Sequence, residues 1–158
     1  MQNRVCEMLG VEFPILAFSH CRDVIAAVSN AGGFGVLGAV AHTPEQLEID
    51  LAWIEAETKG RPYGVDLLLP QKYAGADEGG GLDREAVRAL LPAEQQQFVD
   101  DILRRYEVPP LPDDARRELG RRGGMSVSPR GYEPLLDVAF AHRMKLIASA
   151  LGPPPPSL

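Results

Sequence analysis

Four short apolar runs alternate with segments patterned as helices, and this alternation restricts the chain to a small set of folds. The runs are FPILAF (13–18), FGVLGAV (34–40), YGVDLLLP (63–70) and KLIASALG (145–152). Continuous apolar runs of this length are typical of strands buried on both faces, as in parallel sheets. Alternation with helices predicts parallel strands joined by right-handed crossovers. We therefore predict an α/β fold of order β-α-β-α-β-(insertion)-α-β.

The clearest helix follows the second run. Thr43 is a suitable N-cap, Pro44 suits the first helical position, and Gln46 completes a capping box. The spacing i, i+4, i+7 predicts a buried stripe made of Leu47, Leu51 and Ile54.

Three further helices are predicted outside residues 71–133. One covers 3–9 and stops at Gly10, and another covers 134–144. Between the first two runs, residues 22–32 form a helix whose predicted apolar stripe is Val24, Ala27 and Val28.

Residues 71–133 break the alternation. They contain the runs GADEGGG, PPLPDD and RRGG, which are rich in glycine, proline and charge, and one amphipathic helix is predicted over 93–107. We interpret 71–133 as an insertion, part helix and part loop, packed over one end of the sheet. A length of 158 residues is typical of one domain, so we assign 1–158 to a single domain that contains this insertion.

Composition excludes several classes of partner. The net charge of -6 argues against binding to nucleic acid or to an anionic membrane. There is no apolar stretch near the length of a membrane span and no signal-peptide layout. Cys6 and Cys21 form neither a disulfide framework nor a zinc pattern. We expect a cytoplasmic protein with reduced thiols and no metal site.

The glycine-rich segment SNAGGFGVLG (29–38) resembles a phosphate-binding loop in composition but not in its position. Phosphate loops follow a strand and precede a helix, so that the phosphate meets the helix N-terminus. Here Gly32 and Gly33 follow a helix and precede a strand. We interpret them as turn residues, and we interpret Gly35 and Gly38, inside the strand, as positions that permit close approach of a helix or strong curvature.

Polar residues follow the carboxyl ends of the predicted strands, where parallel sheets carry their chemistry. These residues are Ser19, His20, His42, Asp66, Lys72 and Ser149. We expect Ser19, Asp66 and Ser149 to lie together at this rim. His20 is a candidate general base because its ordinary pKa lies near physiological pH. Two alternatives remain open: His20 could cap a helix or bind a backbone carbonyl, and Asp66 could be satisfied by loop N–H groups.

Three segments together resemble the amino-terminal part of the nitronate monooxygenase family, formerly called 2-nitropropane dioxygenases. They are NRVCEMLGVEFPI, AAVSNAGGFGVLGA and RPYGVDLLLP. The resemblance covers 3–73 and resumes at 134–152. It implies a TIM barrel that binds FMN at the carboxyl ends of its strands and oxidises alkyl nitronates with molecular oxygen. About four of the eight barrel strands are present, so the resemblance implies the amino-terminal half of a barrel.

Two motifs depart from the family pattern, which implies a divergent member. The family has Gly-Gly-Met or Gly-Pro-Met where this chain has Ala17, Phe18 and Ser19, and it has Gly-Val-Asn where this chain has Asp66 in third place. An aspartate can accept a hydrogen bond from a flavin but cannot donate one as an amide can. The family's catalytic histidine and phosphate loops would lie beyond residue 158. The resemblance and the rim position together imply FMN contacts from Ala17, Phe18, Ser19, Asp66 and Ser149, with His20 as the catalytic candidate.

Three functions remain open. The first is FMN-dependent oxidation of alkyl nitronates, or of a related small carbanionic substrate, by oxygen; on this view the present span alone is inactive. The second is a noncatalytic module that forms homo-oligomers through its open sheet edges or binds a partner through 71–133. The third is a barrel lyase or isomerase acting on phosphate-bearing substrates, because fold does not determine function.

Overall fold

The computed structural model describes the chain apart from residues 1–2, 74–75, 77–83, 122–126 and 157. It divides into two compact units. The first combines Met1–Gln71 with Met125–Leu158, and the second is Lys72–Gly124.

The first unit contains one sheet of four strands in the order β1-β2-β3-β4, and all three pairings are parallel. The predicted α/β fold with parallel neighbours is therefore confirmed. The strands are β1 (Leu16–Ser19), β2 (Phe34–Gly38), β3 (Tyr63–Leu68) and β4 (Leu146–Ala150).

The first strand is shorter than its apolar run. The N–H of Phe13 donates to the carbonyl of Gly32, and the N–H of Ile15 donates back to the carbonyl of Phe13. Pro14, between them, has no N–H to contribute to a strand ladder. Residues 13–15 therefore form a turn that leads into β1.

One helix precedes β1, and three others connect the strands of this unit in the predicted order. They are α1 (Arg4–Leu9), α2 (Arg22–Asn30), α3 (Pro44–Thr58) and α7 (Pro129–Ala141). The capping box of α3 is confirmed: the N–H of Gln46 donates to Thr43 Oγ1 at 3.2 Å, and the N–H of Thr43 donates to Gln46 Oε1 at 3.1 Å. The predicted stripe of α3 is fully buried at Leu47, Leu51 and Ile54.

The predicted stripe of α2 is wrong. Val24 is exposed, and the buried residues are Ile25, Ala26 and Ser29. Ser29 can be buried because its hydroxyl donates to the carbonyl of Pro62 at 3.0 Å and accepts from the N–H of Gly35 at 3.3 Å. A pattern that counts only apolar residues cannot detect a buried serine whose partners lie in other elements.

The last helix begins earlier than predicted. Pro129 stands in its first turn behind the N-cap Ser128, and Pro134 lies inside the helix rather than at its start. The predicted start at 134 and end at 144 are therefore wrong, and the helix ends at Ala141.

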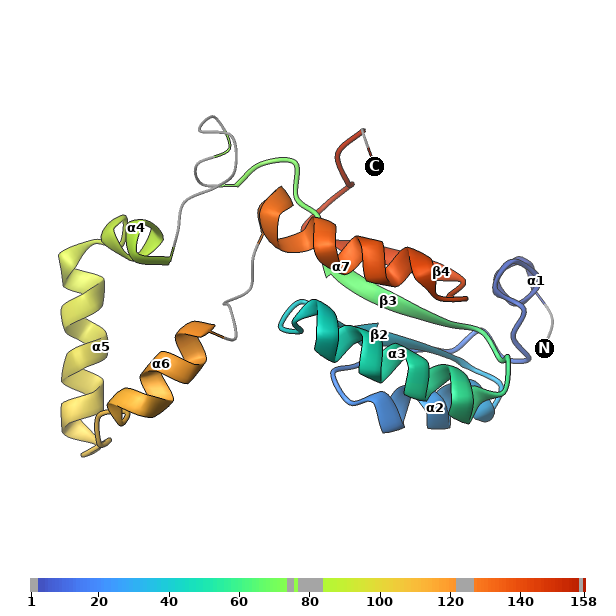
Figure 1. Cartoon of the computed structure of the whole chain (residues 1–158), viewed down its shortest axis with the longest axis horizontal. Helices are drawn as coiled ribbons and strands as arrows, with labels where there is room; N and C mark the ends of the chain where they lie inside the picture. Colours follow the sequence, from blue (N-terminus) through green and yellow to red (C-terminus); the bar gives the residue numbers. More distant parts are fainter. Residues whose placement is uncertain (1–2, 74–75, 77–83, 122–126, 157) are drawn as a thin grey trace. The chain divides into compact units, whose positions relative to one another are not determined.

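The two faces of the sheet are packed against different helices. In Figure 1, α2, α3 and α7 lie in front of the strands. Leu37, Tyr63 and Val65 belong to the buried cluster that also contains side chains of these helices. The opposite face holds a smaller cluster in which Phe34 and Val36 pack with Leu9 of α1.

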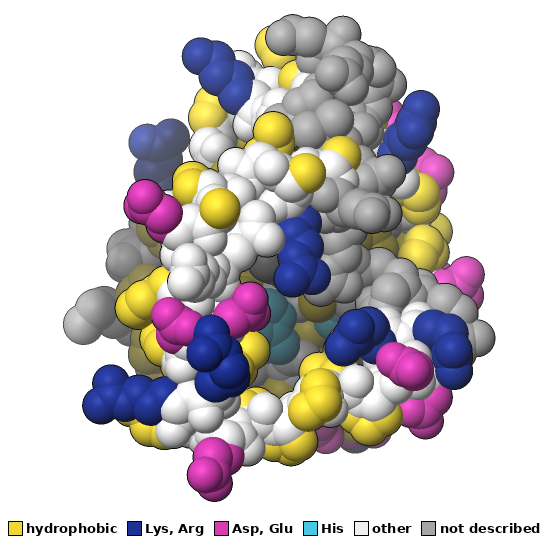
Figure 2. Space-filling view, turned by 90° about the vertical axis from the view of Figure 1, so that its left-hand side faces the viewer, with side chains coloured by type: hydrophobic (Ala, Val, Ile, Leu, Met, Phe, Trp, Pro, Cys, Tyr) yellow, Lys and Arg dark blue, Asp and Glu magenta, His cyan; other side chains and the backbone are white. Residues whose placement is uncertain are grey.

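The second unit consists of α4 (Arg84–Ala89), α5 (Ala93–Arg105) and α6 (Asp113–Arg121). The helix predicted over 93–107 is present, and none of its residues is buried. Figure 2 looks at the chain from the side of α5, and hydrophobic side chains lie at the surface there among charged ones. The assignment of 71–133 as an insertion within one domain stays a prediction. Within the described residues, no helix is both long and apolar enough to cross a bilayer.

Candidate functional site at the carboxyl edge of the sheet

Strand register places two of the predicted site residues on the face opposite the helices. Gly38 pairs with Asp66, and Phe18 pairs with Val36 two residues before Gly38. Side chains alternate between the two faces of a strand, so Phe18 and Asp66 project from the same face. Phe18 is 56% exposed there, and Asp66 is half-buried.

His20 lies over the end of β2. Its Nδ1 is 2.8 Å from the carbonyl oxygen of Gly38, which can only accept, so Nδ1–H donates. Its ring packs edge-on against Phe18, with centroids 5.1 Å apart. A Cβ on residue 38 would lie 2.5 Å from Phe18 Cζ and 2.7 Å from His20 Nδ1. Glycine at 38 therefore makes room for both rings, and the neutral imidazole keeps Nε2 as an acceptor.

The pKa of the Asp66 carboxyl group is shifted by burial and by this histidine. Desolvation raises the pKa of its carboxyl group, and the nearby His20 opposes part of that rise. Asp66 lies in the carboxyl-terminal half of β3, and a carboxylate that is costly to ionise is a common feature of functional sites.

Asp66→Asn should therefore stabilise the protein at neutral pH. The raised pKa means that ionised Asp66 destabilises the folded state above that pKa, and that the cost disappears below the ordinary aspartate range. Urea unfolding at a series of pH values should show a gain for the variant at pH 7 that vanishes as the pH falls. Asp137→Asn, an exposed change on α7, serves as the control. An equal gain at low pH would contradict this account.

The remaining predicted contacts lie on the other face. Ala17 pairs with Gly35, Ser19 with Leu37, and Ser149 with Leu67, which places all three on the helix-covered side. The Ser19 hydroxyl accepts from the N–H of Cys21 at 3.0 Å, and the Ser149 hydroxyl donates to the carbonyl of Gly152 at 2.7 Å.

Ser19 and Ser149 therefore reach the carboxyl edge but do not face Asp66. The expectation that these three side chains lie together is wrong for both serines. Strand limits taken from apolar runs were too imprecise to give side-chain parity. The roles predicted for Ala17, Ser19 and Ser149 stay predictions that the register does not favour.

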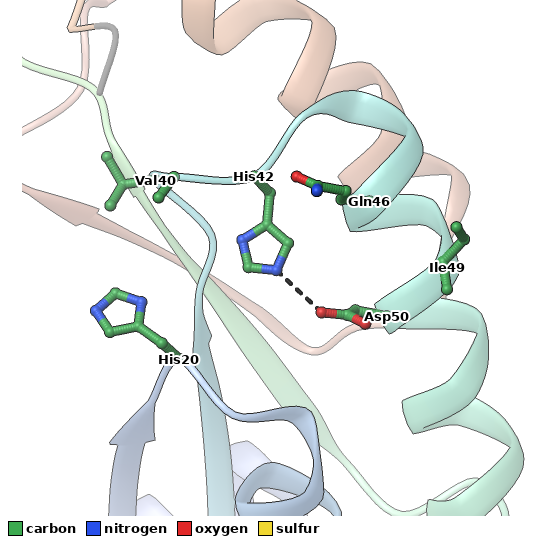
Figure 3. Close-up of a pocket in the computed structure, with 7 residues that line it drawn as sticks. His20, Val40, His42, Gln46, Ile49 and Asp50 are labelled. Carbon is green, nitrogen blue, oxygen red and sulfur yellow. Dashed lines mark hydrogen bonds and ion pairs between the residues drawn. The ribbon is translucent and has the colours of Figure 1, made fainter. Parts of the chain in front are cut away.

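A hollow of about 530 Å³ opens beside His20 at the same edge. Figure 3 shows His42 reaching toward α3, where its Nε2–H donates to Asp50 Oδ2 at 3.0 Å. Asp50 also accepts from Arg22 Nη1 at 2.9 Å. The remaining lining residues include Val40, Ala41, Gln46 and Ile49.

Sequence reasoning found His42 but missed Asp50 and Arg22. Asp50 lies in the middle of a helix, where a charged residue usually faces solvent. Arg22 is 28 residues away from it and stands at the start of α2. Only the packing of α2 beside α3 brings them together, and no local pattern carries that information. The ion pair joins the start of α2 to the middle of α3, where Asp50 lines the hollow.

A second polar cluster lies away from this edge. His142, after α7, is within 3.0 Å of Glu48 and 3.4 Å of Glu55, both on α3. Glu55 also accepts from the Tyr63 hydroxyl at 3.2 Å. A hollow of about 670 Å³ beside Glu55 and Tyr63 lies at the amino edge of the sheet. In parallel α/β folds this edge usually serves stability, so we assign the cluster to packing of α3 against α7.

Within the described ranges, no group of three or more His, Cys, Asp or Glu residues is arranged to hold a metal ion. Cys6 and Cys21 are not joined in a disulfide; the first is buried and the second is exposed.

The fold and the site together define a class. Sequentially ordered parallel βα units with an imidazole and a carboxylate at the carboxyl edge are typical of barrel enzymes. The family model for nitronate monooxygenase matches residues 3–100, and the chain belongs to the nitronate monooxygenase family.

Two kinds of relative illustrate this membership. "Putative monooxygenase Rv1533" of Mycobacterium tuberculosis is 62% identical over 158 residues, which is all of this chain and 41% of that protein. "Probable nitronate monooxygenase" of Staphylococcus aureus, in strains JH9 and Newman, is 33% identical over 77 residues, or 46% of this chain and 21% of that protein. The chain thus spans about two fifths of the length of the first relative.

Proposed function

We propose that this chain forms βα units of a larger barrel, and that the full-length protein is an FMN-dependent oxidoreductase. Its substrate is an alkyl nitronate or a related small carbanion, and oxygen is the electron acceptor. Family membership supports the reaction class. The observation that carries the proposal is that His20, Phe18 and Asp66 share the open face of the sheet at its carboxyl edge.

The outer side of β4 supports the larger barrel. In the described residues, β1 and β4 each pair with one neighbour only. Beside β4 a hollow of about 350 Å³ is lined mainly by apolar side chains, among them the partly exposed Met144 and Ile147. Phe140 at its margin is 70% exposed. A barrel places a further strand and helix at this position, and they would cover these side chains.

The described residues fit the ring of a flavin better than its phosphate. Asp66 offers a carboxylate oxygen to a ring N–H, and Phe18 offers an apolar surface beside it. Among the described residues we assign no phosphate contact. When bound, FMN supplies the capacity to accept electrons from the substrate and pass them to oxygen.

His20 would handle charge and protons on the substrate side. Its Nδ1–H donates to the Gly38 carbonyl, so Nε2 is the ring nitrogen left to meet the substrate. The neutral ring can take a proton from a carbon acid, and the protonated ring can bind the oxygen of an anionic nitronate. The bond to Gly38 also prevents rotation of the ring, so Nε2 keeps one position.

The test is the absorbance and oxygen consumption of the purified full-length protein. We expect flavin absorbance after addition of FMN, and oxygen uptake that depends on an added alkyl nitronate. Ser149→Ala, whose change lies on the other face, should leave both unchanged. A colourless protein that ignores added FMN would overturn the proposal.

A further inference from the structure

Helix α5 has an exposed apolar face that no other described element covers. Its apolar side chains lie along one stripe, and each is between 39% and 69% exposed: Phe98, Val99, Ile102, Leu103 and the C-cap Tyr106. No residue of this 13-residue helix is buried. Isolated helices of this length are marginal in water, and helices in proteins gain their stability mainly by packing an apolar face. The stripe therefore requires a cover.

The charged residues beside the stripe indicate how a second helix packed on it would be oriented. At 100° per residue, Glu94 and Arg105 border the stripe on the same side, the first near the start of α5 and the second at its end. In a parallel pair each border of the stripe faces the partner's opposite border, where Gln96 lies, so neither Glu94 nor Arg105 would meet an opposite charge. An antiparallel copy brings Glu94 toward Arg105 twice, and the two helix dipoles oppose each other favourably.

We propose that α5 pairs with α5 of a second copy of this chain, antiparallel, across the stripe of Phe98, Val99, Ile102, Leu103 and Tyr106. A self-complementary surface of this kind produces a two-fold dimer, in which each contact occurs twice. The pairing does not involve the carboxyl edge of the sheet, so it is independent of the proposed oxidoreductase function.

Analytical ultracentrifugation of the full-length protein at micromolar concentrations tests the pairing. We expect a monomer–dimer equilibrium, and Ile102→Asp should weaken it about 100-fold because each dimer contains two copies of the change at the centre of the contact. Gln97→Asp, on the polar side of the same helix, is the matched control and should leave the equilibrium unchanged. Circular dichroism of each variant checks that the fold is retained.

A charge exchange tests the orientation. Glu94→Arg alone and Arg105→Glu alone should each weaken the dimer severalfold, and the double variant should restore it. A chain that stays monomeric throughout would overturn the proposal. A dimer whose dissociation constant does not change with Ile102→Asp would also overturn it, and would point to contact through the sheet edges. A double variant whose dimer is weakened by the product of the two single effects would contradict the antiparallel orientation.

Discussion

Replacing His20 with alanine should lower kcat/KM of the full-length protein for an alkyl nitronate by about 100-fold or more, the usual range for loss of a proton-handling side chain. The expectation follows from the fixed imidazole. Nδ1–H donates to the Gly38 carbonyl at 2.8 Å, so Nε2 has one position on the sheet face that bears Asp66. Steady-state oxygen consumption measures the loss.

His20→Asn separates the chemical role from a structural one. The asparagine amide can donate to the Gly38 carbonyl, but it has no group that titrates near neutral pH. We expect this variant to fold as the wild type does and to lose activity as fully as the alanine variant. The pH profile of kcat/KM should lose one ionisation in both. Near-normal activity in the asparagine variant would remove His20 from the proton chemistry.

Gly35→Ala should destabilise the fold by about 3 kcal/mol, the upper part of the usual range for overpacking a core. A Cβ on residue 35 would lie 2.6 Å from the carbonyl oxygen of Ile25 and 2.8 Å from its Cα. These are backbone atoms of α2, so relief requires the whole helix to move away from β2. Urea unfolding measures the loss.

The control is Gly60→Asn. Gly60 has a φ of 87° but nothing within 4 Å of an added Cβ, and asparagine tolerates this conformation better than most residues. Its effect should be much smaller than that of Gly35→Ala. Equal stability of the Gly35→Ala variant and the wild type would contradict the close approach of α2 to β2.

Local signals in the sequence were sufficient for the order of elements. Thr43, Pro44 and Gln46 predicted the start of α3 because a capping box is formed entirely by neighbours in sequence. The parallel sheet followed from alternation, which depends on element order rather than on exact limits. Of the two roles expected for Gly35, close approach of a helix is confirmed, since Ile25 of α2 lies directly against it.

The predictions failed where the outcome depended on distant partners or on single-residue register. Ser29 is buried because Pro62 and Gly35 satisfy its hydroxyl, and a hydrophobic pattern does not include such partners. The faces of Ser19 and Ser149 depend on register, and an error of one residue reverses a side chain. Asp50 joins the site through Arg22 at the start of α2 and His42 in the turn before α3.

The central claim is that the face bearing Asp66 lies against the flavin ring, and the reduction potential of bound FMN tests it most directly. A carboxylate beside the ring disfavours the addition of electrons, so Asp66→Asn in the full-length protein should raise the potential. We expect a rise on the order of 30 mV, equivalent to about 1.4 kcal/mol for two electrons. Ser149→Ala should leave the potential unchanged. Tightly bound FMN whose potential is the same in the Asp66→Asn variant and the wild type would contradict the account.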